Sequence, residues 1–318
     1  MWGTLWHKTW NAMNYLYGAL MLRSTCHLRR LKNIYNGGRC FVIGNGPSLT
    51  YDDLRMLQSE TTFACISLIR LFDEIPFKPT YYFAQDNHII LDNKEQIEKL
   101  NTTRFIKSHY ARRYHIPGAT YYKMLFPKSP IGFSRNIANV VYSGQTVTYS
   151  MIQFAAYMGF KEIYLIGEDC NYSPGNSTIS ADSYFDKRLF NSKRKYAAPE
   201  VDTNLLAYAR AKEVCDREGI HIYNATRGGK LEIFPRVDFD TLFDKKERPT
   251  NAHNNSNSTD TACHTHSQRP EKHREISLHR VLQYRDPLRH DTCRRAQRLR
   301  ISTKRSKPLE QRKIHQQN

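Results

Sequence analysis

The run Gly44-Asn45-Gly46-Pro47-Ser48 follows directly on a short apolar stretch, and polar residues with helical spacing come after it. Glycine has no Cβ, so backbone N–H groups in such a turn can approach a phosphate closely. The run has neither the six-position dinucleotide fingerprint nor the Lys-Ser/Thr pair of a P-loop. It predicts a nucleotide-binding turn made of Gly44, Asn45, Gly46 and Ser48, with a plain strand-to-helix turn as the alternative.

Two aspartates come at the ends of strand-like segments, where ligands bind in open α/β sheets. Asp86 follows Tyr81–Gln85 and would hold a ribose hydroxyl or a Mg²⁺ that bridges phosphates. Asp169 ends the segment Gly159–Asp169 and is the first candidate for a catalytic or metal-binding carboxylate. The alternative for each is a structural role, as a helix cap or a turn former.

Two cations, Arg227 and Lys230, flank the pair Gly228-Gly229 after the last strand-like segment. Glycines between positive side chains suit an anion-binding loop. A flexible surface loop is the alternative.

Strand-like and helix-like segments alternate between residues 39 and 244, which indicates a mostly parallel sheet. We therefore expect an α/β fold, with a Rossmann-like, doubly wound sheet and helices on both faces. The expected strands are Cys40–Gly44, Thr62–Ser67, Thr80–Asp86, Arg104–Ser108, Glu162–Gly167 and His221–Ala225. The expected helices are Tyr51–Gln58, Asn93–Leu100, Val147–Met158 and Thr203–Glu218, with loop-like insertions at 110–145 and 170–200.

The net charge of +18 is uneven along the 318 residues. Residues 245–318 hold 18 Lys and Arg against 7 Asp and Glu, and they contain few large apolar side chains. Such a composition predicts a basic disordered tail, so we divide the chain at 1–32, 33–244 and 245–318. Seven cysteines without a CxxC pair favour a reducing compartment and disfavour a zinc site.

Residues 1–32 are predicted to form an amphipathic helix. Three tryptophans, at positions 2, 6 and 10, fall on one helical stripe with Met13, Tyr17 and Leu20. The helix would pack on the folded body or lie on an anionic membrane surface. With neither a transmembrane helix nor a signal peptide expected, we predict a cytoplasmic protein with peripheral contact to the inner face of the cell membrane through residues 1–30.

Several segments together resemble the 6-hydroxymethylpterin diphosphokinase MptE-like domain family, in particular its bacterial members associated with surface-polysaccharide synthesis. The segments are Phe41–Leu49, Tyr81–Asp86, Gly159–Asp169 and Ile222–Phe239, and the likeness covers about residues 33–243. The pterin kinases transfer diphosphate from ATP with Mg²⁺. The resemblance thus implies that Asp86 and Asp169 take part in this Mg²⁺-dependent transfer of diphosphate.

The chain is more distantly similar to the family 42 sialyltransferases. These share the Gly-Asn-Gly-Pro-Ser-Leu turn and a strand that ends in Gly-x-Asp. In them the turn binds the cytidine monophosphate donor, which implies that Asn45, Gly46 and Ser48 lie near a nucleotide.

The chain departs from the sialyltransferases at two places. Ile66 stands near the position of a functional asparagine, and no histidine lies between His115 and His221, where that family has its base. Asp202 or Glu200 occupies the corresponding region. The comparison makes Asp202 the second candidate for a catalytic carboxylate.

Three functions remain open. The first is a glycosyltransferase-like, nucleotide-dependent transferase of bacterial cell-surface polysaccharide synthesis, with a nucleotide-activated sugar as donor and a glycan or lipid-linked acceptor. The second is diphosphate transfer from ATP with Mg²⁺ to a hydroxymethylpterin-like alcohol. The third is a non-catalytic nucleotide-binding protein. Specific nucleic-acid binding is not expected, because no RNA- or DNA-binding pattern is visible.

Overall fold

The computed structural model describes residues 2–111, 114–126, 131–171, 179–193 and 201–243, with the backbone alone for 2–12 and 66–67. The chain divides into two compact units, residues 1–254 and 255–318. All elements described below belong to the first unit. The predicted basic tail lies outside the described residues, and the predicted domain limits stay predictions.

A seven-stranded, entirely parallel sheet forms the centre of the first unit, in the order β5-β4-β3-β2-β1-β8-β9. Its strands are β1 (Arg39–Ile43), β2 (Thr62–Cys65), β3 (Tyr81–Ala84), β4 (Thr103–Lys107), β5 (Thr120–Tyr122), β8 (Glu162–Ile166) and β9 (His221–Asn224). Two short parallel strands, β6 (Met124–Leu125) and β7 (Val141–Tyr142), pair separately. The predicted fold class, a Rossmann-like doubly wound sheet, is confirmed.

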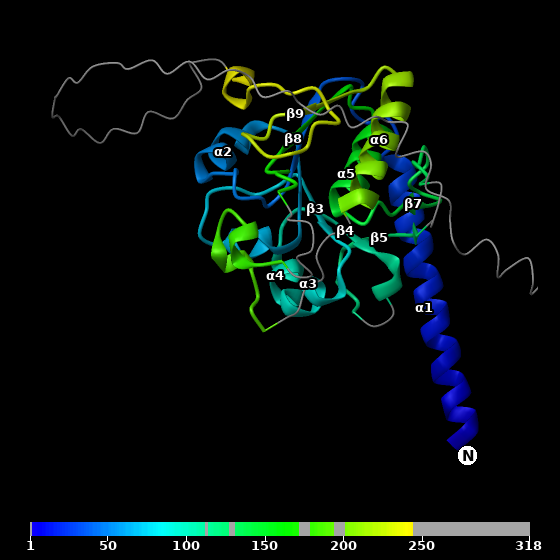
Figure 1. The fold of residues 1–318 in the computed structure, drawn as a ribbon. Helices are drawn as coiled ribbons and strands as arrows, with labels where there is room; N and C mark the ends of the chain where they lie inside the picture. The colour runs from blue at the N-terminus through cyan, green and yellow to red at the C-terminus, as the bar shows by residue number, and fades with distance from the viewer. Residues whose placement is uncertain (1, 112–113, 127–130, 172–178, 194–200, 244–318) are drawn as a thin grey trace, which may run out of the picture. The chain divides into compact units, whose positions relative to one another are not determined.

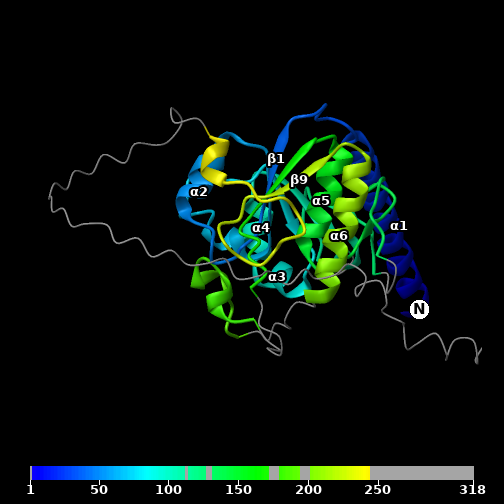
Figure 2. The same ribbon diagram turned by 45° about the horizontal axis from the view of Figure 1, so that its top comes forward.

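Helices cover both faces of this sheet, as Figures 1 and 2 show. One face packs on α5 (Val147–Met158) and α6 (Val201–Arg217), while α1 (Trp2–Arg30) lies along the β5 edge and contributes to both cores. The other packs on α2 (Tyr51–Met56), α3 (Asn87–Asp92) and α4 (Lys94–Lys99). Short 3₁₀ turns complete the unit: η1 (Leu57–Ser59), η2 (Ile66–Leu71), η3 (Ser108–Tyr110), η4 (Ala181–Ser183), η5 (Lys187–Leu189) and η6 (Phe239–Leu242).

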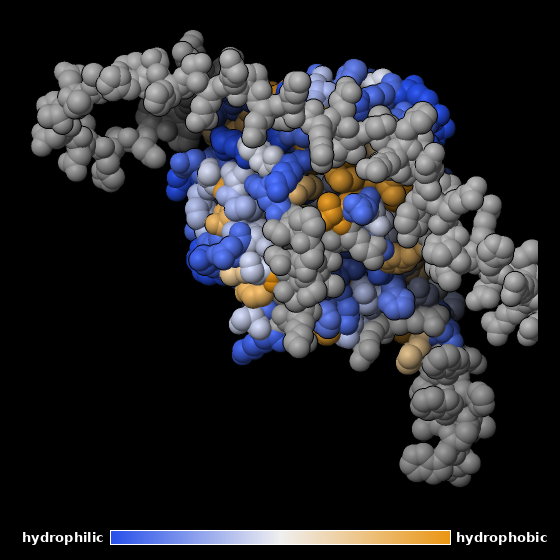
Figure 3. Space-filling view, in the orientation of Figure 1, coloured by the Kyte–Doolittle hydropathy of each residue, from blue (hydrophilic) through white to orange (hydrophobic). Residues whose placement is uncertain are grey.

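Alternation along β1 shows why the sheet needs both layers. Cys40 and Val42 point into one apolar core, while Phe41 and Ile43 point into the other, and all four are fully buried. Successive strand side chains face opposite sides, so a strand that is apolar throughout has to be covered twice. In the view of Figure 3 the outer surface is largely hydrophilic, with hydrophobic residues gathered near α5 and α6.

Helix α1 closes the β5 edge of the sheet. The Tyr121 amide of β5 donates to Ser24 Oγ (3.0 Å), and Thr120 Oγ1 lies 2.6 Å from His27 Nδ1. An open strand edge offers unpaired backbone groups to other chains, and a covering helix removes that hazard. No described helix is both long enough and apolar enough to cross a bilayer.

The sequence predicted most elements and missed some. All six expected strands are present, and the expected helix after β1 begins at a capping box formed by Thr50 and Asp53. The structure adds β5 and the β6–β7 pair inside the region read as a loop, 110–145, and it adds α3. The strand expected to reach Ser67 ends at Cys65, where η2 begins.

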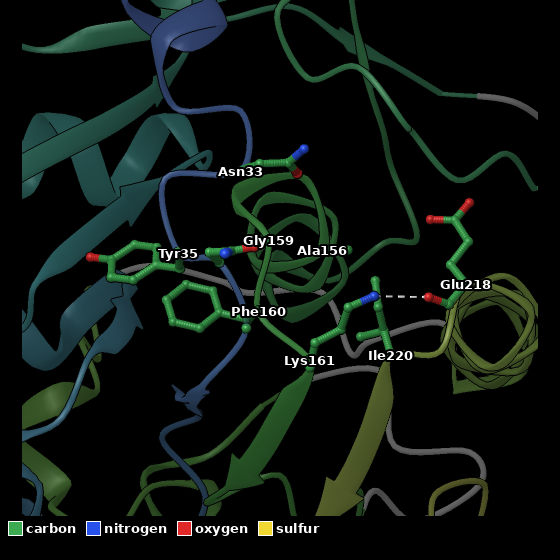
Figure 4. A pocket seen from close by; sticks show the side chains of 10 residues that line it. Asn33, Tyr35, Ala156, Gly159, Phe160, Lys161, Glu218 and Ile220 are labelled. Atoms are coloured by element: carbon green, nitrogen blue, oxygen red, sulfur yellow. Dashed lines mark hydrogen bonds between the residues drawn. The ribbon is translucent and has the colours of Figure 1, made fainter.

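The end of α5 shows how tightly the layers are joined. Gly159 caps this helix at φ 98°, and its carbonyl accepts from the Gly37 amide (3.0 Å). The preceding carbonyl, of Met158, accepts from the Tyr35 amide (2.9 Å). Figure 4 shows Gly159 enclosed between Tyr35 and Phe160.

We predict that Gly159→Ala destabilises the protein more than Gly219→Ala. Both glycines have positive φ, which costs an alanine roughly 1–2 kcal/mol. A Cβ on Gly159 would also overlap the Tyr35 carbonyl, whereas none of the atoms described around Gly219 lies within 4 Å of such a Cβ. Urea unfolding of the two variants measures the difference, and equal losses would contradict this account of the α5 end.

Candidate functional site

The candidate site lies at the carboxyl edge of the sheet, where the strand order changes direction. The chain leaves β1 toward β2 on one side, and β8 pairs with β1 on the other, with Ile43 opposite Ile166. Ligands of doubly wound sheets bind at such a switch point, outside the carboxyl ends of the strands. The turns after β1 and β8 are thus the first place to look for chemistry.

The glycines of the β1 turn serve close packing against the β8 turn. The Gly44 amide donates to the Ile166 carbonyl (2.8 Å), and the Gly46 amide donates to the Gly167 carbonyl (2.9 Å). A Cβ on Gly44 would overlap the Gly167 carbonyl, and one on Gly46 would overlap the Asp169 carboxylate. Neither position has room for a larger residue.

The Asp169 carboxylate occupies the place where the sequence predicted a phosphate. Its Oδ2 accepts from Ser48 Oγ (2.8 Å) and, at 3.4 Å, from the Ser48 amide. The amides of Gly44, Gly46 and Ser48 donate to these protein acceptors, and the nucleotide-binding role of the turn stays a prediction. The Asp169 carboxylate, from the neighbouring turn after β8, lies in the space that Gly46 leaves by having no side chain.

Asp169 also holds the third turn of the site. Its carbonyl accepts from the Lys230 amide (2.7 Å), and a Cβ on Gly229 would overlap the Asp169 backbone. Burial raises the pKa of Asp169, while the hydrogen bonds from Ser48 act against that rise. With 6% of its surface exposed, Asp169 ties three turns together.

Glu168, the residue before it, points into a polar cluster at the start of α5 and α6. Its Oε1 accepts from Thr148 Oγ1 (2.5 Å), and its Oε2 accepts from the Tyr208 hydroxyl (3.3 Å). Burial raises the pKa of Glu168 to about 7, even though these hydrogen bonds favour the ionised form. A carboxyl group that titrates near neutral pH can both accept and donate a proton under physiological conditions.

The sequence singles out Asp169 as the candidate carboxylate and not Glu168. Both follow β8, and nothing in their spacing separates them. The difference comes from partners far away in the chain, because Ser48 engages Asp169 while Thr148 and Tyr208 engage Glu168.

Three asparagine side chains near this edge have a buried carbonyl oxygen without a hydrogen-bond partner among the described residues: Asn45, Asn87 and Asn204. Asn45 follows β1, Asn87 opens α3 after β3, and Asn204 lies one turn before Tyr208 on α6. The Asn45 Nδ2 group faces Cys65 Sγ at 4.0 Å. A buried acceptor left unpaired costs about 1–3 kcal/mol, so these oxygens are suited to a ligand that brings N–H or O–H donors.

Asp86 has the structural role that was its alternative. Its Oδ1 accepts from the amides of His88 (2.7 Å) and Ile89 (3.1 Å), which makes Asp86 the N-cap of α3. No group of three or more His, Cys, Asp or Glu within the described ranges is arranged to hold a metal ion. A Mg²⁺ ion that bridges nucleotide phosphates needs only one or two protein carboxylates, so the Mg²⁺ site at Asp86 stays a prediction. Its neighbour Gln85 points inward and accepts from Ser150 Oγ (3.0 Å).

Of the two cations of the predicted anion site after β9, Arg227 is paired with protein carboxylates. Arg227 forms ion pairs with the buried carboxylate of Asp53 (2.7 Å) and with Asp240 (3.0 Å). The Lys230 side chain is exposed, and its amide is bound to Asp169. Asp202 lies in the first turn of α6, and among the described residues it forms no hydrogen bond with Glu168 or Asp169.

The described part of the second insertion, 179–193, folds over the β1 turn. The Phe185 amide donates to the Asn45 carbonyl (3.1 Å), and Arg70 Nη1 donates to the Leu189 carbonyl (2.9 Å). Asp186 accepts from the Tyr51 hydroxyl, and the Arg188 guanidinium lowers the pKa of Asp186. The insertion therefore covers the site on the side of α2.

A surface depression of about 260 Å³ lies at the opposite, amino-terminal edge of the sheet. Figure 4 shows Tyr35, Phe160 and Lys161 around it, with Lys161 Nζ donating to the Glu218 carbonyl (3.0 Å). It contains neither the perturbed carboxyl group nor the unpaired asparagine oxygens. The carboxyl edge remains the candidate site for chemistry.

The parallel sheet and the turns at its carboxyl edge define a Rossmann-like α/β protein. The expected place for a ligand in such a protein is the switch point between β1 and β8. The family model described as 6-hydroxymethylpterin diphosphokinase MptE-like matches residues 17–175, half of the chain. The chain belongs to this family. No curated protein matches it.

Solved structures similar to the chain include two glycosyltransferases. One is the MAf glycosyltransferase from Magnetospirillum magneticum AMB-1, at 16% identity and a TM-score of 0.45 over 71% of this chain. The chain spans only 39% of that protein's length. The other is the sialyltransferase CstII from Campylobacter jejuni with cytidine-5'-monophosphate, at 16% identity and a TM-score of 0.38, covering 63% of this chain and 84% of CstII. The family model confirms the resemblance to the MptE-like family.

We predict that Glu168→Gln raises the free energy of unfolding at pH 8 and has little effect at pH 4. The folded-state pKa of Glu168, about 7, lies above its ordinary value of 4.5. Below pH 4.5 the Glu168 carboxyl is protonated in both the folded and the unfolded state. As the pH rises, the unfolded state ionises first, and the stability that the protonated side chain contributes to the fold is lost as the pH passes through 7. The gap corresponds to at most about 3 kcal/mol at pH 8.

Urea unfolding at both pH values measures the effect. Glu95→Gln, which removes an exposed carboxylate from α4, is the matched control and should leave the pH dependence unchanged. A Glu168→Gln variant that is no more stable than the parent at pH 8 would contradict the burial of an ionisable Glu168.

Proposed function

We propose that this protein is a nucleotide-dependent transferase of the glycosyltransferase type, which uses a nucleotide-activated sugar in bacterial cell-surface polysaccharide synthesis. One observation carries the proposal. At the switch point of the sheet, a carboxyl group with a pKa near 7 lies at the same strand ends as buried asparagine oxygens that lack donors. Membership of a transferase-like family and the two resemblances support the same class of reaction.

In the proposed reaction Glu168 acts as general base. The carboxylate takes the proton of an acceptor hydroxyl, and the hydroxyl oxygen forms a bond to the anomeric carbon of the donor sugar. The bond from that carbon to the nucleotide's phosphate oxygen breaks, and its electron pair leaves with the nucleotide. A general base of matched pKa contributes about 10²–10⁴-fold to the rate.

The nucleoside is proposed to lie against Asn45 and Asn204. Their unpaired oxygens are acceptors, so they fit the hydroxyl groups of a ribose or the amino group of a base. Ser48 would contribute through Asp169, which fixes the β1 turn and thereby places Asn45. Asp169 is then a positioning residue, and Asp202, at the start of α6, is the alternative base.

Diphosphate transfer from ATP is the second candidate, because the matching family model is named for a hydroxymethylpterin diphosphokinase. In that reaction a Mg²⁺ ion neutralises the phosphates. Asp86 is the residue expected to hold it, and its Oδ1 already accepts from the His88 amide as the N-cap of α3. The nucleotide-sugar reaction uses groups that are present at the carboxyl edge, and it is therefore preferred.

We predict that a cytidine or uridine nucleotide, or its sugar, raises the melting temperature and that Asn45→Ala removes most of this effect. A ligand at a hundredfold excess over its Kd stabilises a protein by about 2.7 kcal/mol. Thermal shift with CMP, UDP, their sugar conjugates and ATP with Mg²⁺ makes the comparison. Asn36→Ala, at the amino-terminal depression, is the control and should keep the full response.

A response to ATP with Mg²⁺ alone would favour the diphosphokinase reaction. A response that is lost in Asn36→Ala and kept in Asn45→Ala would move the nucleotide to the opposite edge and overturn the proposed site.

We predict that Glu168→Gln lowers kcat by about 10²–10⁴-fold with the nucleotide-sugar found in that screen, while the thermal shift persists. The kcat of the parent should rise with pH up to about 7, because a base has to be ionised to accept the proton. Asp202→Asn serves as the matched variant and should retain activity. Full activity in Glu168→Gln together with its loss in Asp202→Asn would assign the base to Asp202. Nucleotide binding without turnover in the parent would favour a non-catalytic protein.

A further inference from the structure

The apolar stripe of α1 packs on the sheet for only part of the helix. Leu28 and Leu31 belong to one core, and Tyr17, Leu20 and Met21 pack partly buried against the other. Met13 continues the same helical spacing and is 57% exposed. The contacts of α1 with the sheet therefore end near Met13, while the apolar stripe continues toward the N-terminus of the helix.

The helix extends beyond that point as far as Trp2. Figure 1 shows its N-terminal half projecting clear of the sheet and of the other labelled helices. The sequence of this half places tryptophan at positions 2, 6 and 10, in the same three-to-four-residue spacing as Met13 and Tyr17. An apolar stripe without a covering layer in its own unit needs another apolar environment.

The charge around this stripe decides which environment fits. Helix α1 contains four Lys and Arg and no Asp or Glu: Lys8 lies in its N-terminal half, and Arg23, Arg29 and Arg30 lie toward its other end. A second copy of this helix would bring the same positive charge and be repelled. An anionic bilayer offers both a surface of opposite charge and an apolar layer beneath it.

We propose that the N-terminal half of α1 lies in the surface of an anionic lipid bilayer, with the tryptophans at the headgroup level and the sheet domain held beside the membrane. The helix is too polar to span the bilayer, so it binds parallel to the surface. This inference is independent of the proposed reaction, because it depends on α1 and not on the carboxyl edge.

The chain itself provides the reporter for a test. Its three tryptophans are all in residues 2–10, so intrinsic tryptophan fluorescence of the full chain monitors only this segment. Binding of the basic residues 245–318 to the same vesicles would leave that signal unchanged. We expect a blue shift of the emission, and protection from acrylamide quenching, with vesicles of phosphatidylcholine and phosphatidylglycerol, but not with phosphatidylcholine alone.

Matched variants separate the contributions. Lys8→Gln should weaken partition roughly fivefold, because each cation near an anionic surface contributes about 1 kcal/mol. Lys99→Gln, an exposed cation on α4, should have no effect on the tryptophan signal. In vesicle flotation, Trp6→Ser with Trp10→Ser should reduce recovery with lipid, whereas Tyr15→Ser should not, since Tyr15 is 79% exposed but lies off the stripe.

Tryptophan emission that stays unchanged with anionic vesicles would overturn the proposal. A blue shift that appears without lipid and grows with protein concentration would also overturn it, by assigning the stripe to a second copy. The same holds for a blue shift that RNA produces and vesicles do not.

Discussion

The close approach of two turns, after β1 and after β8, is the constraint on which the site depends. Two glycines, Gly44 and Gly46, leave the space, and the Asp169 carboxylate fills part of it and accepts from Ser48. Because Asp169 also receives the Lys230 amide, the turn after β9 is fixed by the same residue. Asp169 thus joins three loops at the carboxyl edge: it belongs to the turn after β8, its carboxylate contacts the β1 turn at Ser48, and its backbone carbonyl contacts the turn after β9.

In this arrangement the two adjacent acids, Glu168 and Asp169, have different partners and different roles. Asp169 accepts from Ser48 of the β1 turn, whereas Glu168 accepts from the hydroxyls of Thr148 and Tyr208 in surroundings that raise its pKa to about 7. Catalytic sites commonly pair a group that maintains geometry with one whose proton affinity is tuned by burial. The glycine turn contributes by placing Asn45, and its amides are already used within the protein.

Local patterns in the sequence revealed much of the fold. The strands could be predicted because β1 and its neighbours are apolar on both faces. The start of α2 is likewise set locally, by the capping box of Thr50 and Asp53. Strand β5 was missed since it is short and depends on Ser24, nearly a hundred residues earlier. The site was harder for the same reason. Arg227 has its partner Asp53 far along the chain, and nothing local tells Glu168 from Asp169.

The most direct measurement is a ¹³C NMR titration of the Glu168 carboxyl, assigned by comparison with Glu168→Gln, with and without the nucleotide that binds. The account predicts a midpoint near pH 7 in the free protein and a change of that midpoint on binding, because the ligand enters the same buried cluster. A midpoint near 4.5 that is indifferent to the nucleotide would contradict it.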